Sequence, residues 1–70
     1  MTSGQNHPQE NDLPAGLSQP AQRALAAAGV QRLEQLAQFS EAEVRQWHGI
    51  GPKAMSQLRQ ALGERGLSFR

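Results

Sequence analysis

The residues best suited to chemistry in this 70-residue chain form the segment Gly49-Ile50-Gly51-Pro52-Lys53. Glycine permits positive φ and close backbone approach, so two glycines around an aliphatic residue predict a tight turn that buries Ile50 as a plug. A helix starting after this turn would present unpaired N–H groups and its positive dipole end, which favour an anion such as phosphate. Lys53 is unfavourable to that dipole, so its presence indicates an anion. The same glycines would also serve a plain turn between helices.

Two further side chains are candidates to contact the same anion. Arg23 lies opposite the apolar face of the first predicted helix, where it is either solvated or in contact with a phosphate. His48 would donate to a phosphate when protonated, or remain a neutral imidazole satisfied within the turn. Ala26 and Ala27 share the outer side of the helix with Arg23. They leave a smooth surface for close approach of another backbone, and helix propensity explains them equally well.

No set of residues indicates catalysis or metal binding. The glutamates lie on different predicted helices, no nucleophile has an adjacent base, and no P-loop or dinucleotide fingerprint occurs. Two histidines without any cysteine give no recognisable metal set. We therefore expect a protein that is not an enzyme and has no cofactor.

The composition limits the size and the setting of the fold. An apolar fraction of 37% in 70 residues can fill one modest core and leaves no room for a second domain. The absence of cysteine removes a disulfide framework and fits a reducing, cytoplasmic setting. The longest apolar stretch, from Ala24 to Val30, is too short to span a membrane, and no signal peptide is recognisable.

The net charge of +1 hides an uneven distribution. Residues 1–16 carry Glu10 and Asp12 and no basic residue, whereas residues 17–70 carry seven basic and four acidic residues, a net charge of +3. A mildly basic body weakly favours an anionic partner. The same excess is common on an ordinary solvated surface.

The chain divides into a polar tail and one domain. Residues 1–12 have no aliphatic residue after Met1, and we predict that they are disordered and dispensable. Residues 13–70 are predicted to form the folded domain. Its first helix is capped by Ser18 or Gln19 and ends at Gly29.

Three more helices follow from the apolar spacing. The second ends at Phe39, and the third begins with a capping box formed by Ser40 and Glu43. The fourth, which is the longest, runs from about residue 51 to residue 65. Since no window alternates with period two, the fold class is all-α.

An internal repeat relates two parts of the domain at an offset of 33 residues. Gly16-Leu17-Ser18 with Ala21 and Leu25 matches Gly49-Ile50-Gly51 with Ala54 and Leu58. Both copies read glycine, aliphatic, small residue, then alanine and leucine at helical spacing. The second copy is the better formed.

The segment Trp47-His48-Gly49-Ile50-Gly51-Pro52-Lys53-Ala54, followed by Leu58 and Leu62, resembles the helix-hairpin-helix motif. Residues 17–69 are similar to the C-terminal domain of the bacterial RNA polymerase alpha subunit. The matching positions include Leu17-Ser18, Ala28-Gly29-Val30, Ser40-Glu41 and Arg65-Gly66-Leu67-Ser68-Phe69. The resemblance implies a compact four- to five-helix, SAM-like or tandem helix-hairpin-helix domain.

The resemblance also implies contact with DNA phosphates that does not depend on sequence. The family's contacts correspond to Gly49, Gly51 and Lys53, and we add Ile50, Arg23 and His48 as candidate DNA-binding residues. The alpha-subunit domain reaches the minor groove with an arginine and an asparagine on its first helix. Here these positions are Pro20 and Arg23, which depart from the family's minor-groove pair.

Two functions from different classes follow from these observations. The first is a stand-alone monomeric module that binds the DNA backbone. The second is a protein-interaction module of the same fold, docking to transcription or repair proteins through the alanine-rich first helix. A domain that keeps the fold without affinity is a third possibility. No membrane association is expected.

Overall fold

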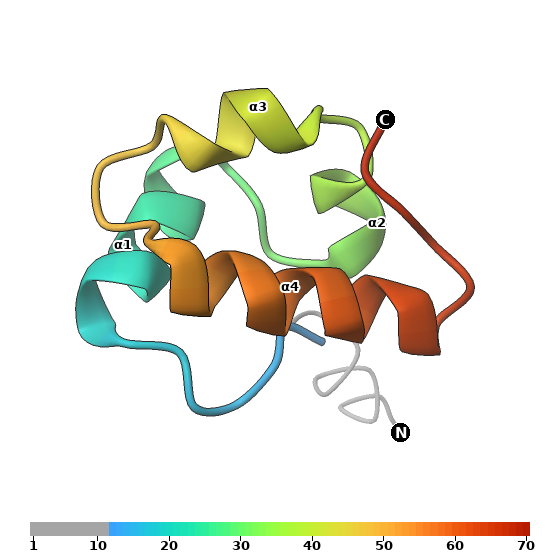
Figure 1. Ribbon diagram of the computed structural model, residues 1–70. Coiled ribbons are helices and arrows are strands. Elements are labelled where there is room, and N and C mark those ends of the chain that lie inside the picture. Colours follow the sequence, from blue (N-terminus) through green and yellow to red (C-terminus); the bar gives the residue numbers. More distant parts are fainter. Residues whose placement is uncertain (1–11) are drawn as a thin grey trace, which may run out of the picture.

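The computed structural model describes residues 12–70, which form helices joined by short loops and contain no strand (Figure 1). The helices are α1 (Gln19–Ala27), α2 (Leu33–Leu36), α3 (Glu41–Arg45) and α4 (Pro52–Glu64). The all-α prediction is confirmed for this part of the chain. None of these helices is long and apolar enough to cross a membrane.

The first and last helices begin and end close to the predicted positions. The Ser18 hydroxyl caps α1 by accepting a hydrogen bond from the Ala21 N–H at 3.2 Å. The chain leaves α1 through Gly29, which has a φ of +77°. Gly51 is the N-cap of α4 and offers no side chain to it, and Pro52 occupies the first helical position, where no N–H is needed.

The second helix is much shorter than the spacing predicts. The Gln35 side chain accepts hydrogen bonds from the N–H groups of Gln31 and Arg32 at 2.6 and 2.9 Å, which fixes the helix start at Leu33. After one turn the helix ends at Leu36. Helix α2 therefore stops well before Phe39, and the predicted end is wrong.

The capping box of the third helix is confirmed. The Ser40 N–H donates to the Glu43 carboxylate at 2.7 Å, and the Glu43 N–H donates to the Ser40 hydroxyl at 3.1 Å. These hydrogen bonds, with a smaller effect of the Arg70 charge, hold the pKa of Glu43 below its usual value. The box orients α3 so that Val44 is buried.

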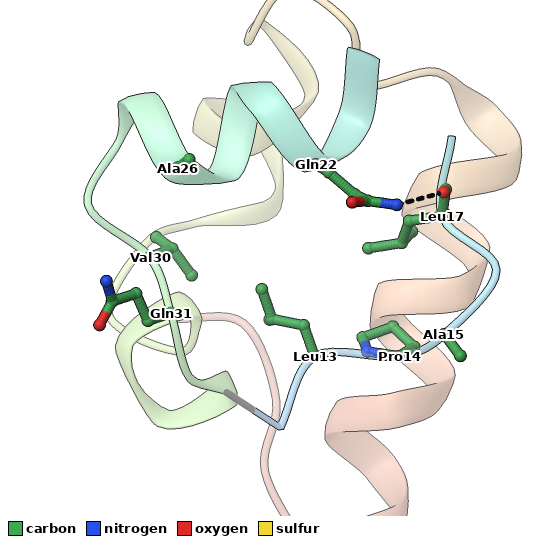
Figure 2. A pocket seen from close by; sticks show the side chains of 8 residues that line it. All are labelled: Leu13, Pro14, Ala15, Leu17, Gln22, Ala26, Val30 and Gln31. Carbon is green, nitrogen blue, oxygen red and sulfur yellow. Dashed lines mark hydrogen bonds between the residues drawn. The ribbon is translucent and has the colours of Figure 1, made fainter. Parts of the chain in front are cut away.

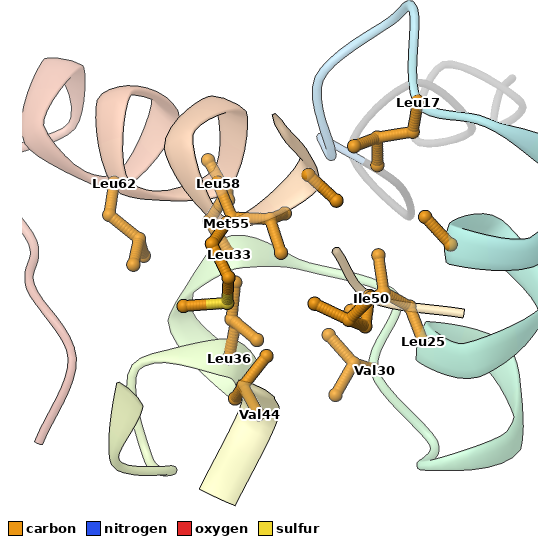
Figure 3. Packing of buried hydrophobic residues seen from close by; sticks show 12 residues of the cluster. Leu17, Leu25, Val30, Leu33, Leu36, Val44, Ile50, Met55, Leu58 and Leu62 are labelled. Atoms are coloured by element: carbon orange, nitrogen blue, oxygen red, sulfur yellow. The ribbon is translucent and has the colours of Figure 1, made fainter. Parts of the chain in front are cut away.

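The core is formed by twelve buried apolar residues drawn from every helix and from the connecting turns (Figure 3). The largest side chains that are almost completely buried are Leu25, Leu36, Leu58, Leu62 and Val44. No polar residue of the described chain is buried. Any polar chemistry within residues 12–70 is therefore confined to the surface.

The predicted disordered segment 1–12 lies outside the described residues except for Asp12. The Asp12 carboxylate accepts a hydrogen bond from the Leu33 N–H, at the start of α2, at 2.7 Å. Its other oxygen pairs with Arg65, just after α4, at 2.7 Å. Asp12 thus belongs to the folded domain, whose boundary lies at least one residue earlier than the expected Leu13.

We expect Asp12→Ala to lower the free energy of unfolding by about 1–2 kcal/mol, because it removes the acceptor for a helix N-terminal N–H and one ion pair. Arg65→Ala removes only the ion pair, whose arginine is more than half exposed, and should cost less than about 1 kcal/mol. Urea denaturation of both variants measures the difference. Equal losses would contradict the capping role.

Candidate functional site

The two copies of the internal repeat adopt the same local geometry. We call residues 16–18 the first glycine turn and residues 49–51 the second. Gly16 and Gly49 have φ values of +90° and +100°, and the aliphatic residues that follow, Leu17 and Ile50, are buried. Each turn ends in an extended N-cap residue that starts a helix. The repeat in sequence is therefore also a repeat in structure.

The two glycine turns meet at one groove of about 370 Å³, lined by residues of both turns and by Pro20 and Lys53. A β-carbon on Gly49 would lie 2.4 Å from the Pro20 carbonyl oxygen, so the second turn packs directly on the start of α1. On the other side, the Gln57 side-chain amide donates to the Gly16 carbonyl at 3.5 Å. The groove therefore lies between the N-terminal ends of α1 and α4.

The two helix ends differ in what they offer to a ligand. The Ser18 hydroxyl already accepts one N–H of α1, and Pro20 has no N–H to give. At α4, Gly51 provides no cap, and the N–H groups of Gly51, Lys53 and Ala54 have no hydrogen-bond partner within residues 12–70. No acidic residue lies in the first turn of α4. The α4 end is thus the more open and the more electropositive.

Ion pairing within the described chain separates the basic residues into two groups. Arg32, Arg45, Arg59 and Arg65 each pair with a carboxylate within 4 Å. Arg70 lies close enough to Glu43 to lower the pKa of its carboxyl group. The remaining basic residues, Arg23 and Lys53, are exposed and have no carboxylate partner among residues 12–70. Their charges are the ones free to meet an anion.

The structure brings three of the six predicted site residues, Gly49, Gly51 and Lys53, to the groove. Lys53 is the second residue of α4 and lines the groove. Arg23 does not line the groove itself but lies one helical turn after Pro20, which does. His48 is exposed and precedes Gly49. It lies against Ala24 and Ala27 of α1 and does not line the groove.

Ile50 has a structural role in the core and does not contact a ligand. Its side chain is 7% exposed, as the plug prediction requires, and its N–H donates to the Trp47 carbonyl at 3.1 Å. Neither its side chain nor its N–H group is available to a phosphate. We therefore remove Ile50 from the set of candidate DNA contacts.

Among the described residues, Glu41 is a carboxylate that lines a neighbouring cavity at the start of α4, together with Gly51 and Pro52. Glu41 receives hydrogen bonds from Arg59 at 2.5 Å and from Arg45 at 3.5 Å. The Arg59 hydrogen bond and the charges of both arginines hold the pKa of Glu41 below its usual value, so it stays ionised. No carboxylate lines the groove. Within residues 12–70, no three residues among His, Cys, Asp and Glu are grouped to hold a metal ion.

A second cavity, of about 470 Å³, lies between the start of the described chain and the outer side of α1 (Figure 2). Its apolar lining includes Leu13, Ala26 and Val30. At its rim the Gln22 side-chain amide donates to the Leu17 carbonyl at 2.8 Å. No charged side chain lines it.

Comparison of the chain with models of protein families, with curated proteins and with solved structures gives no match. The function must therefore be inferred from the geometry of the groove and its charges. The sequence had indicated the second turn, Lys53 and Arg23 separately. It missed that both turns share one groove, although the constant offset between the repeats was a signal for it.

Proposed function

We propose that this domain is a small helix-hairpin-helix module that binds DNA through its phosphate backbone without sequence preference. The observation that carries the proposal is the position of the two unpaired cations. Arg23 and Lys53 are placed by α1 and α4, whose N-terminal ends bound a single groove without any carboxylate. The resemblance of residues 17–69 to the RNA polymerase alpha C-terminal domain supports the same function.

In the proposed complex, one phosphate lies at the N-terminus of α4. The free N–H groups of Gly51, Lys53 and Ala54 would donate to its oxygens, and the Lys53 ammonium would add a full charge. Arg23 would contact a neighbouring phosphate. These groups recognise phosphate oxygens that every nucleotide shares, so they position the DNA and carry no sequence information. Pro20 offers no side-chain donor to read a base edge.

Binding should depend on salt with a small slope, since only two of the lysine and arginine side chains lack a carboxylate partner within residues 12–70. With about two phosphates neutralised, log K against log salt should have a slope of about −2. Fluorescence anisotropy of a labelled mixed-sequence duplex at several salt concentrations measures this slope. Absence of binding at low ionic strength would contradict the proposed function.

Filling the open end of α4 should block binding without harming the fold. Gly51 has a φ of −104°, and no atom lies within 4 Å of the position that a β-carbon would take, so the site accepts a side chain. Gly51→Asp would cap α4 as Ser18 caps α1, keep or slightly raise the melting temperature, and repel the phosphate. We expect most DNA affinity to be lost, whereas Gly51→Ser should lose less. Retained affinity in Gly51→Asp would exclude α4 as the phosphate site.

The second candidate function is docking of a transcription or repair protein. The apolar cavity beside Ala26 favours it, because the cavity has no charged lining and lies on the alanine-rich helix (Figure 2). Amide shifts in nitrogen–proton spectra separate the two functions. DNA binding shifts Gly49, Gly51 and Lys53, whereas docking of a partner helix shifts the surroundings of Ala26 and leaves Lys53 unchanged.

A further inference from the structure

A shallow apolar patch adjoins the second glycine turn. Ala24, Ala27 and Ala28 of the α1 end, with Trp47 and His48, line a hollow of about 340 Å³. We call these five residues the Trp47 patch. Pro20, which touches Gly49, lies one helical turn before Ala24 on the same side of α1. The patch therefore continues the surface of the groove along α1.

The indole of Trp47 offers an aromatic surface to this patch. Trp47 is half-buried, and its ring meets that of Phe39 edge-to-face with centroids 5.0 Å apart. In such a pair Phe39 covers at most one face of the indole. The part of Trp47 that lines the hollow is surrounded by alanine methyl groups and the imidazole of His48, so a flat apolar group can approach it closely.

The charges around the patch suit a nucleotide better than an apolar peptide. Arg23 precedes Ala24 and lies one turn before Ala27, so its unpaired charge is next to the patch. The second glycine turn and Lys53 lie at the same end of the patch as Arg23, because Pro20, one turn before Arg23 on α1, touches Gly49. No carboxylate lines the patch or the groove. An aromatic hollow whose groove end carries two cations without a carboxylate partner in residues 12–70 matches a base whose adjoining phosphates lie at the groove.

We propose that the Trp47 patch binds the base of an unpaired nucleotide in the DNA strand held by the groove, an inference that rests on the proposed DNA-binding function. A paired base is stacked inside the duplex and cannot reach the patch, whereas a bulged or single-stranded base can. Stacking on an aromatic side chain is tolerant of base identity. The module would then favour bulged DNA over fully paired DNA of the same sequence.

The test compares three labelled DNAs: a paired duplex, the same duplex with one bulged thymidine, and the same bulge with an abasic nucleotide. We expect the bulged duplex to bind about tenfold tighter than the other two, as judged by anisotropy at fixed salt. Trp47 is the only tryptophan and the chain has no tyrosine, so its fluorescence reports on the patch directly. It should be quenched by the thymidine bulge and not by the abasic one.

Two exposed alanines of α1 provide a matched pair of variants. Ala27→Leu fills the patch, whereas Ala26→Leu makes the same change beside the other cavity. We expect Ala27→Leu to lose the preference for the bulge and keep its affinity for paired duplex, and Ala26→Leu to keep both. Equal affinity for all three DNAs would overturn the proposal that the Trp47 patch binds a base, and would leave the proposed DNA-binding function standing. If Ala27→Leu lost affinity for the paired duplex, the Trp47 patch would contact the duplex itself. The proposal that it binds an unpaired base would then be overturned. Absence of binding to any of the DNAs would overturn both proposals.

Discussion

Replacing Gly49 with alanine is expected to lower the free energy of unfolding by about 2–5 kcal/mol, a large share of what a domain of this size has available. Two effects add at this position. The φ of +100° is a conformation that alanine rarely adopts, and the new methyl group would lie 2.4 Å from the Pro20 carbonyl oxygen. Because that oxygen belongs to backbone, relief requires the second turn to move away from α1. Urea denaturation followed by circular dichroism measures the loss.

The other glycine of the turn provides the control. Gly51 has an extended conformation and open space around it, and a serine there would act as a helix cap. Gly51→Ser should therefore unfold at the same urea concentration as the parent or at a slightly higher one. If both variants lost stability equally, the close packing of Gly49 on Pro20 would not be the reason for its glycine.

The contrast between these glycines shows what the sequence can predict. Motifs within a few residues predicted the turn plug Ile50, the capping box at Ser40 and the end of the first helix at Gly29, because the interactions that decide them are local. The different requirements of Gly49 and Gly51 come from Pro20, far away in the chain. The spacing of residues in the turn cannot show that Pro20 packs against Gly49 and not against Gly51.

A long-range contact explains why the domain begins earlier than predicted. The polar residues before Asp12 place it in the predicted tail, yet its hydrogen bond to Leu33 and its pair with Arg65 depend on how distant segments pack. The observed end of α2 differs from the predicted end at Phe39 because the prediction rested on apolar spacing alone. That spacing reports which residues face the core and does not fix where the helix stops.

Ion pairing is the property of the candidate site that could least be predicted from the sequence. Seven basic residues are visible in the sequence, and none is marked as free. Arg59 and Arg65 are paired with carboxylates distant in sequence, Glu41 and Asp12. Only the folded chain therefore shows that Lys53 and Arg23 have no carboxylate partner within residues 12–70. The candidate site is therefore defined as much by the pairs formed elsewhere as by its own residues.

Lys53→Glu should reduce affinity for duplex DNA by about 10- to 100-fold, because hydrogen bonds to charged groups contribute about 1.5–3 kcal/mol. The slope of log K against log salt should fall in magnitude by about one. The fold should not suffer: Lys53 is exposed and unpaired in the described chain, and a glutamate near the N-terminus of α4 is favourable to the helix dipole. Anisotropy titrations and thermal melts of the same samples measure both quantities.

A variant with the same change of charge separates a local contact from the loss of net charge. Arg70 is at the end of the chain that lies beside α2, on the opposite side from the start of α4 (Figure 1). Arg70→Glu should therefore weaken binding by less than about threefold, through the long-range field alone. The loss of affinity in Arg23→Glu should lie between those of Lys53→Glu and Arg70→Glu. The α1 end beside Arg23 is already capped by Ser18 and offers fewer free N–H groups to a phosphate. Equal effects of Lys53→Glu and Arg70→Glu would mean that DNA senses only the overall charge and that the groove is not where the phosphate lies.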